Sequence, residues 1–145
     1  MVLFSPSPAY GEDTEQRAEE FAITAAAERG LFSPDLLYRA LVLYVENPEI
    51  VYGQALLESG HFSSTLFLES NNLLGMKHPK VRETLSTGEF KGFSVYANWL
   101  DCVKDYALWQ KYYKDKGHNM EDYYAFLGNV YCPEENYVNL VKQLI

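Results

Sequence analysis

The sequence predicts a mainly α-helical (α+β) fold with a small β-hairpin lobe, and three observations predict this class. Helix-capping residues and prolines divide most of the chain into segments of helical length, within which apolar residues recur three or four positions apart. One central stretch, residues 84–99, instead carries Thr, Phe, Val and Tyr around two glycines, as a short hairpin does. The chain has 145 residues, 48% of them hydrophobic, which is enough for one compact core.

The N-terminal elements follow from their caps. Residues 1–12 contain prolines and a glycine, and they predict an irregular arm ahead of one domain that covers residues 13–145. Thr14 is the expected cap of a first helix, which stops at Gly30. A Ser-Pro pair at 33–34 begins the second helix, which ends before the next proline.

The middle of the chain holds two more helices and the hairpin. Pro48 begins the third helix, "PEIVYGQALLES", which ends at Gly60. The pair Ser63-Ser64 is expected to start a short fourth helix that reaches about Glu69. The turn-rich segment "SNNLLGMKHPK" then leads to the hairpin.

Three helices are predicted after the hairpin. The stretch "NWLDCVKDYALWQKYYKDKG" has the spacing of a long amphipathic helix that ends at Gly117. Asn119 is the expected cap of a shorter helix, "MEDYYAFLG", and Pro133 is the expected start of the last one. Aromatic residues of the long helix fall at helical spacing and are interpreted as core packing: Trp99, Trp109, Tyr112 and Tyr113.

Composition argues against several classes of function. The net charge is −8, so the chain lacks the basic footprint that binding to nucleic acid requires. His and Cys show no metal-ligand spacing, and no metal or cofactor is predicted. Cys102 and Cys132 either form one disulfide or stay as small buried residues. The N-terminus does not read as a signal peptide, and no apolar run is long enough to predict a membrane span.

One carboxylate, Glu58, stands near the end of the third helix in the otherwise apolar stretch "YGQALLESGHFSS". The C-terminal end of a helix dipole and any burial both disfavour an anion, so both raise the pKa of Glu58. A carboxyl group that keeps its proton near neutral pH suits general acid catalysis. Helix position alone favours a simpler interpretation, an exposed glutamate paired with lysine or with water.

The order of elements supports a catalytic role for Glu58. Lysozyme-like folds have this arrangement: a helix that ends in an acid, followed by a hairpin and then by long helices. "QALLESG", residues 54–60, resembles the "AQ-x-x-x-ESG" motif of the bacterial glucosaminidases of glycoside hydrolase family 73. Three further segments resemble that family's "NNLFGIK", "F-R-x-Y-x-S … DY" and "YATD-x-x-Y … I-x-x-II" motifs: "SNNLLGMK" (70–77), "FSVYANWLDCVKDY" (93–106) and "YCPEENYVNLVKQLI" (131–145). The four occur in the same order and cover about residues 48–145.

The resemblance implies a lysozyme-like glycoside hydrolase that acts at the bacterial cell wall on peptidoglycan glycan strands. The bond cleaved would be the β-1,4 bond between N-acetylglucosamine and N-acetylmuramic acid. Glu58 matches the family's catalytic acid. Tyr131 matches the tyrosine that lines the cleft near the scissile bond, although a helix-end aromatic that packs on the core fits its position equally well.

The resemblance does not single out one residue as the second carboxylate of the reaction. In the family it lies in or near the hairpin, and Glu89 within "TGEF" is the leading candidate. Glu83 is its rival, Glu69 is a weaker one, and Glu89 equally fits a solvated turn. The acetamido group of the substrate could also supply the nucleophile, which lowers the need for a protein base.

Three residues are expected to contact the substrate: His61, Asn72 and Tyr96. His61 follows the acid closely and either tunes its pKa or lies on the surface beside the site. Asn72 and Tyr96 belong to the matching motifs. Asn72 also suits a tight turn, which is the more common role of Asn in such a segment.

Two alternatives to a glucosaminidase stay open. A muramidase or lytic transglycosylase could act with Glu58 alone, and a non-catalytic wall-binding or virion structural module could retain the fold. The retained acid within "ESG" argues against the module. Without a visible signal peptide, delivery by a larger assembly such as a phage particle, or release at lysis, is expected.

Overall fold

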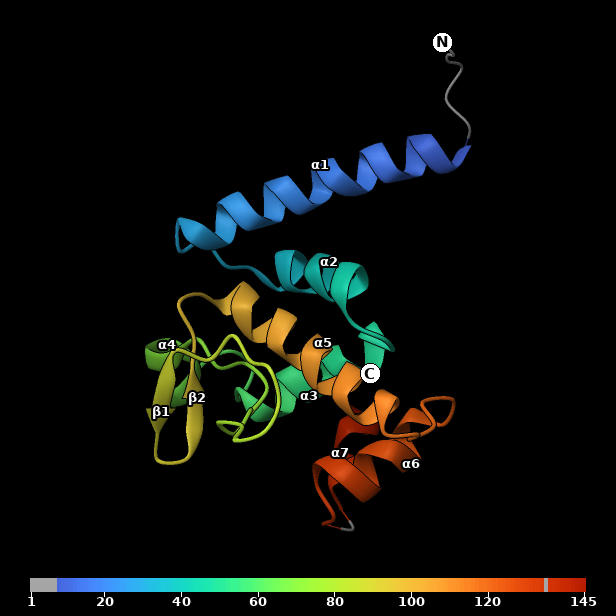
Figure 1. The fold of residues 1–145 in the computed structure, drawn as a ribbon. Helices are drawn as coiled ribbons and strands as arrows, with labels where there is room; N and C mark the ends of the chain where they lie inside the picture. Colours follow the sequence, from blue (N-terminus) through green and yellow to red (C-terminus); the bar gives the residue numbers. More distant parts are fainter. Residues whose placement is uncertain (1–7, 135) are drawn as a thin grey trace.

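The computed structural model describes residues 8–134 and 136–145 and has the predicted class, with seven α-helices and one antiparallel hairpin in this part of the chain (Figure 1). The helices are α1 (Pro8–Glu28), α2 (Pro34–Tyr44), α3 (Pro48–Glu58), α4 (Thr65–Ser70), α5 (Trp99–Asp115), α6 (Tyr123–Phe126) and α7 (Tyr137–Gln143). The hairpin strands are β1 (Gly88–Phe90) and β2 (Phe93–Val95), and the π-helix η1 (Leu127–Tyr131) follows α6 directly.

Helices α2, α3 and α4 begin where their caps predict. The Ser33 hydroxyl accepts a hydrogen bond from the Leu36 amide at 3.0 Å, and the Ser64 hydroxyl accepts one from Phe67 at 3.1 Å. Pro48 occupies the first turn of α3, where its missing N–H leaves no helical hydrogen bond unmade. Local chemistry therefore determines these three starts.

Three other helix starts differ from the prediction. Helix α1 begins at Pro8 rather than near Thr14, because proline fits the first helical turn; residues 1–7 of the expected arm lie outside the described part. Helix α6 is capped by Asp122, since the Asn119 side chain instead accepts from the amide two residues on at 2.7 Å. Helix α7 begins at Tyr137, not at Pro133.

Helix α3 runs through the centre of the molecule, with α2 and α7 packed against it (Figure 1). Val51 and Ala55 are fully buried on its apolar face. Gly53 lets α7 approach closely, because a Cβ there would lie 3.0 Å from Ile145 Cγ1 and 3.3 Å from Val141 Cγ1. The carboxyl end of α3 is therefore held between elements that are distant in the sequence.

The first helix packs on the body over only part of its length. Ile23 and Ala27 are fully buried, whereas residues 13–18 are exposed and extend past the body in Figure 1. Arg39 of α2 holds Glu19 of α1 through two hydrogen bonds of 2.9 and 2.6 Å. Helix α1 thus braces α2, which in turn packs against α3.

A buried carboxylate joins the hairpin region to α5. Asp105 is fully buried and accepts both Arg82 guanidinium hydrogen bonds, at 2.9 and 3.0 Å. Thr84 and the Leu85 amide also donate to it, as does the Tyr96 hydroxyl at 2.5 Å. Five donors from one loop and one strand exit therefore converge on Asp105 and fix the loop that precedes the hairpin.

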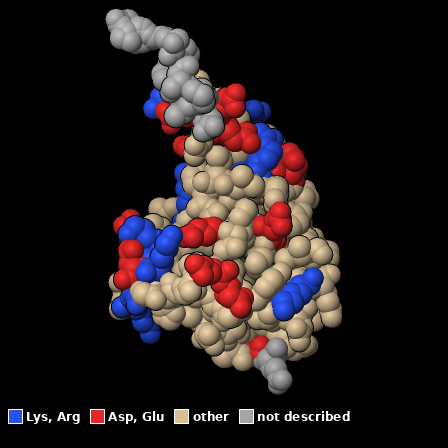
Figure 2. Space-filling view, turned by 90° about the vertical axis from the view of Figure 1, so that its right-hand side faces the viewer, with Lys and Arg blue, Asp and Glu red and all other residues tan. Residues whose placement is uncertain are grey.

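Surface charge and the cysteines complete the description. On the face shown in Figure 2, Lys and Arg lie interspersed with Asp and Glu. Cys102 is buried and Cys132 is partly buried, and both are free thiols rather than partners in a disulfide. Within the described residues, no helix combines the length and the apolarity that a membrane crossing requires.

Candidate active site

The chain turns sharply after α3, and this turn leaves Glu58 at the helix end. Gly60, His61 and Phe62 all have positive φ, at 56°, 57° and 67°. The Ser59 hydroxyl donates to the Ala55 carbonyl and accepts from the Phe62 amide, so it holds both sides of the turn. The chain leaves the helix axis within one residue of the acid, and the Glu58 side chain faces an open cavity.

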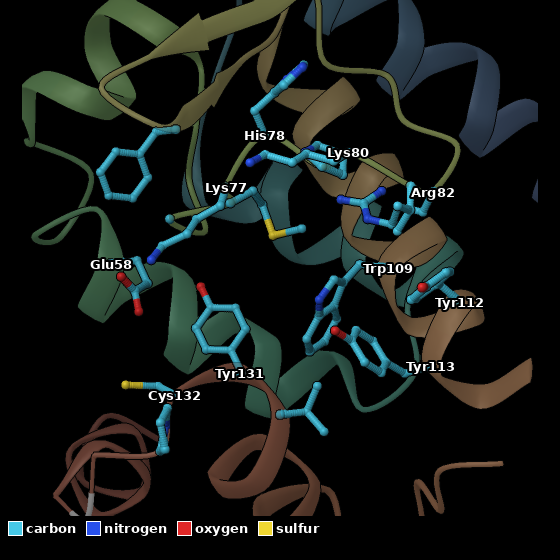
Figure 3. A pocket seen from close by; sticks show the side chains of 17 residues that line it. Glu58, Lys77, His78, Lys80, Arg82, Trp109, Tyr112, Tyr113, Tyr131 and Cys132 are labelled. Atoms are coloured by element: carbon cyan, nitrogen blue, oxygen red, sulfur yellow. The ribbon is translucent and has the colours of Figure 1, made fainter. Parts of the chain in front are cut away.

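That cavity has a volume of about 590 Å³, and Figure 3 shows it with Glu58 at one end. Helix α5 contributes an aromatic wall of Trp109, Tyr112 and Tyr113, and the segment around η1 contributes Tyr131 and Cys132. The loop before the hairpin supplies a basic wall of Lys77, His78, Lys80 and Arg82. Aromatic faces beside a carboxyl group suit a carbohydrate ligand, because sugar rings present apolar faces and polar edges.

Tyr131 lies between Glu58 and the aromatic wall (Figure 3). Its ring meets Trp109 edge to face at 5.5 Å and Tyr137 at the same centroid distance. Its hydroxyl donates a short hydrogen bond to the Leu74 carbonyl. Burial, followed by the charge of Glu58, holds the pKa of Tyr131 well above its usual value, so the hydroxyl stays protonated. Tyr131 therefore lines the cavity and also packs against the core, so its position fits both interpretations.

The environment of Glu58 favours its protonated form. Burial raises the pKa of Glu58 above its usual value, and a hydrogen bond from Tyr137 opposes that rise without cancelling it. Among the described residues that line the cavity, Glu58 is the only carboxylate. The site therefore has a carboxyl group suited to donate a proton, within reach of a ligand in the cavity.

Gly75 forms the backbone that closes against Glu58. Its φ is +61°, and a Cβ there would lie 2.7 Å from Glu58 Oε1 and 3.5 Å from the Tyr131 hydroxyl. Only glycine adopts this conformation readily and also leaves room for the carboxyl group. The glycine of "NNLLGMK" thus leaves the space that the Glu58 carboxyl group occupies.

We expect Gly75→Ala to reduce hydrolysis about a hundredfold, because the new methyl group displaces the Glu58 carboxyl group. Gly92→Ala is the matched control, since Gly92 also has positive φ, at +87°, but no atom within 4 Å of its added Cβ. Both variants should lose about 1–2 kcal/mol of folding free energy from backbone strain. Equal activity in the two variants would show that Gly75 does not position the acid.

The structure does not bring Glu89 or His61 into this cavity. Glu89 lies on the exposed strand β1 and lines a separate groove of about 560 Å³, which shares Phe93 with the cavity of Glu58. His61 is exposed in the turn after α3 and is absent from the cavity lining. The rival Glu83 is also exposed and outside the lining.

Asn72 and Tyr96 are structural residues here, contrary to the expectation that they contact substrate. The buried Asn72 side chain donates to the Met76 and Ser94 carbonyls, both at 2.9 Å, and accepts from the Met76 amide at 3.0 Å. Tyr96 is buried and its hydroxyl donates to Asp105. Both side chains are committed to the backbone or the core, and neither reaches the cavity.

Sequence reasoning missed the aromatic wall and Tyr137. Trp99 is in the core as predicted, and Trp109 and Tyr113 also pack against the core, but these two and Tyr112 line the cavity as well. Tyr112 and Tyr113 follow Trp109 by three and four residues, which places all three on one face of α5, and that is the signal that could have found them. Tyr137 aligns with the second tyrosine of the "YATD-x-x-Y" motif, which was a signal for it, but its contact with Glu58 depends on residues far along the chain.

Comparisons with known proteins identify the family and the fold. The glucosaminidase family model, described as mannosyl-glycoprotein endo-β-N-acetylglucosaminidase, matches residues 36–145. No curated protein matches the chain. The structure of the catalytic domain of the autolysin Auto from Listeria monocytogenes is similar in fold, with a TM-score of 0.52 and 21% sequence identity over 100% of this chain and 95% of that one.

The family match extends over about three quarters of the chain and includes Glu58, Gly75 and Tyr131. The resemblance found in the four sequence motifs is therefore confirmed, and so is the fold class. The chain belongs to the glucosaminidase family, glycoside hydrolase family 73, and is a peptidoglycan hydrolase domain of the endo-β-N-acetylglucosaminidase type.

Proposed function

We propose that the protein cleaves the β-1,4 bond between N-acetylglucosamine and N-acetylmuramic acid, with Glu58 as the general acid. The observation that supports this most is the half-buried Glu58 carboxyl group at one end of an aromatic cavity, with its pKa raised by burial. Glu58 would protonate the glycosidic oxygen as the bond to the sugar breaks. The sugar rings would lie against Trp109, Tyr112 and Tyr113.

The nucleophile is proposed to come from the substrate, not from Glu89. Glu89 lies outside the cavity that Glu58 lines, whereas paired carboxylates of a glycosidase face each other across one bond. The acetamido oxygen of N-acetylglucosamine would attack its own anomeric carbon as the leaving sugar departs. Water would then open the ring so formed, and Glu58 would take the proton from that water.

Tyr131 is suited to assist this attack. Its hydroxyl proton is committed to the Leu74 carbonyl, so its oxygen lone pairs remain for a donor on the ligand. The acetamido N–H is such a donor. Accepting from this N–H would increase the electron density on the acetamido oxygen, which is the attacking atom.

The basic wall supports a substrate that carries carboxylates. The whole chain has a net charge of −8, yet Lys77, His78 and Lys80 gather on one side of the cavity. In Figure 3 the Lys77 side chain extends along the cavity toward Glu58. Peptidoglycan bears carboxylates on its peptide stems, and a local concentration of cations attracts such a substrate. Plain N-acetylglucosamine polymers lack these groups.

A comparison of hydrolysis with binding tests the proposal against a wall-binding or virion structural module. Purified, fluorescently labelled peptidoglycan is incubated with the wild type, and soluble label is measured beside label retained with the protein in the pellet. An enzyme releases soluble fragments in proportion to time and protein. Binding to the pellet without any release from several wall types would overturn the proposal.

Action at the cell wall follows from the family, and the route by which the protein reaches the wall is a separate proposal. We propose delivery by a larger assembly, such as a phage particle, or release at lysis. Detection of the protein within purified particles would test it.

A further inference from the structure

A chain of hydrogen bonds, most of them buried, leads from the α2–α3 connection toward Glu58. Gln110 of α5 binds the backbone of Glu46 twice, accepting from its amide and donating to its carbonyl, both at 2.9 Å. The Gln110 amide nitrogen also donates to the Tyr123 hydroxyl at 2.8 Å. Tyr123 lies 2.6 Å from the hydroxyl of Tyr106, and Tyr106 lies 2.5 Å from Gln54 Oε1.

The chain ends at the acid. Gln54 Nε2 donates to the Tyr137 hydroxyl at 3.0 Å, and Tyr137 is hydrogen bonded to Glu58. Gln54, Tyr106, Tyr123 and Tyr137 are all buried. Polar groups without access to water must bond to one another, because an unpaired buried donor costs about 1–3 kcal/mol.

The direction of donation along this chain is determined. The Glu46 amide can only donate, so it fixes the oxygen of the Gln110 side chain and makes its nitrogen the donor to Tyr123. If Gln54 were turned around, Tyr106 would donate to Tyr123 and the Tyr123 proton would have no partner in the chain. In the observed orientation the hydroxyl protons run from Tyr123 to Tyr106 and from Tyr106 to Gln54, and Gln54 donates to the Tyr137 oxygen, which leaves the Tyr137 proton available to Glu58.

We propose that Tyr137 is a positioning residue for Glu58: it donates to one carboxyl oxygen and so leaves the acidic proton on the other. A protonated carboxyl group accepts through the oxygen without hydrogen, so a fixed donor determines which oxygen can protonate the glycosidic bond. This proposal rests on the proposed function, because it concerns the proton that Glu58 transfers. Tyr137 touches the acid and not the reacting sugar.

The test compares Tyr137→Phe with Tyr123→Phe. Both variants remove a buried hydroxyl from the same chain of hydrogen bonds, but only Tyr137 contacts Glu58. The Glu58 carboxyl carbon is followed by NMR over a pH series, and kcat and KM are measured on peptidoglycan. The other ionisable groups around the cavity near Glu58 are unchanged in both variants: Lys77, His78, Tyr131 and Cys132.

We expect Tyr137→Phe to raise the pKa of Glu58 by about one unit, because the carboxylate loses a donor that stabilises it. The pH above which activity falls should rise equally, and kcat should drop about tenfold with KM little changed. Tyr123→Phe should match the wild-type titration and kcat. An unchanged titration and kcat in Tyr137→Phe, or equal changes in both variants, would reduce Tyr137 to a structural residue.

The wild type supplies a second readout if a variant fails to fold. The Tyr137 ring carbon that carries the hydroxyl should change its resonance as Glu58 titrates, and the same carbon of Tyr123 should not. These titrations do not require hydrolysis. If the protein cleaves no peptidoglycan but shows the coupled titration, the proposed function is refuted and the contact between Tyr137 and Glu58 stands. If the protein is active but shows no coupling, only the contact is refuted.

Discussion

Glu58→Gln should lower the rate of peptidoglycan hydrolysis by about 10²–10⁴-fold, which is the usual contribution of general acid catalysis. Glutamine has the same shape but carries no transferable proton, so the leaving sugar would depart as a poor, unprotonated alkoxide. The measurement is the initial rate of new reducing ends from purified peptidoglycan. Thermal unfolding should be nearly unchanged, because Glu58 is half-buried at the edge of the cavity and not in the core.

Glu89→Gln is the matched control for this substitution. It makes the same chemical change at an exposed strand position outside the cavity, so most of the activity should remain. A loss as large as that of Glu58→Gln would identify Glu89 as the second catalytic carboxylate. Such a result would refute the substrate-supplied nucleophile while it leaves the role of Glu58 intact.

Asp105→Asn should destabilise the protein by about 3–5 kcal/mol, which is the usual cost of removing one partner of a buried ion pair. The Arg82 guanidinium would remain buried beside an uncharged amide, since only 5% of its side chain is exposed. Asparagine also replaces one carboxylate oxygen, an acceptor, with an NH2 group, a donor. The groups that bond to Asp105 are donors, so this NH2 group would face other donors. Chemical denaturation at neutral pH measures the change.

Asp115→Asn provides the comparison on the same helix. Asp115 pairs with Lys111 at 2.7 Å, but both side chains are exposed and screened by water, so the loss of this pair should cost far less than the loss of Asp105. Similar losses for the two variants would mean that the network around Asp105 does not stabilise the fold. The activity of Asp105→Asn should also fall, because Arg82 belongs to the loop that forms one wall of the cavity.

The Asp105 contribution should also depend on pH. Burial raises the pKa of Asp105, but the hydrogen bonds from Arg82 and Tyr96 outweigh that effect and hold it below the ordinary value of 3.8. A carboxyl group with a lowered pKa in the folded state stabilises the protein above its unfolded pKa, and that stabilisation is lost as the pH falls through the folded value. The difference in stability between wild type and Asp105→Asn should therefore shrink below about pH 4.

Much of the framework could be predicted because it depends on neighbouring residues. Caps at Ser33 and Ser64 and the proline at 48 act within one helical turn, and they fixed three helix starts. Glu58 was also predictable, because its position at the helix end and the "ESG" motif are both local. The hairpin followed from glycine spacing, with Gly88 pairing opposite Val95.

The remaining features depend on partners that no local pattern reveals. Asparagine is a residue type typical of turns, yet the side-chain amide of Asn72 donates to the Ser94 carbonyl, 22 residues away, and this side chain is buried. The spacing of Trp109 and Tyr113 predicts a shared face but not whether that face covers the core or a cavity. Gln54 and Tyr137 are 83 residues apart in the sequence, so their hydrogen bond and its effect on Glu58 emerge only from the fold.

Analysis of the new chain ends tests the central claim most directly. Purified peptidoglycan is digested with the wild type, the products are reduced with borohydride, and mass spectrometry identifies the terminal sugars. The account predicts reduced N-acetylglucosamine at the new ends, and none of these ends with Glu58→Gln. Reduced N-acetylmuramic acid would indicate a muramidase, and anhydro-muramic ends would indicate a lytic transglycosylase; either result would contradict cleavage of the bond proposed here.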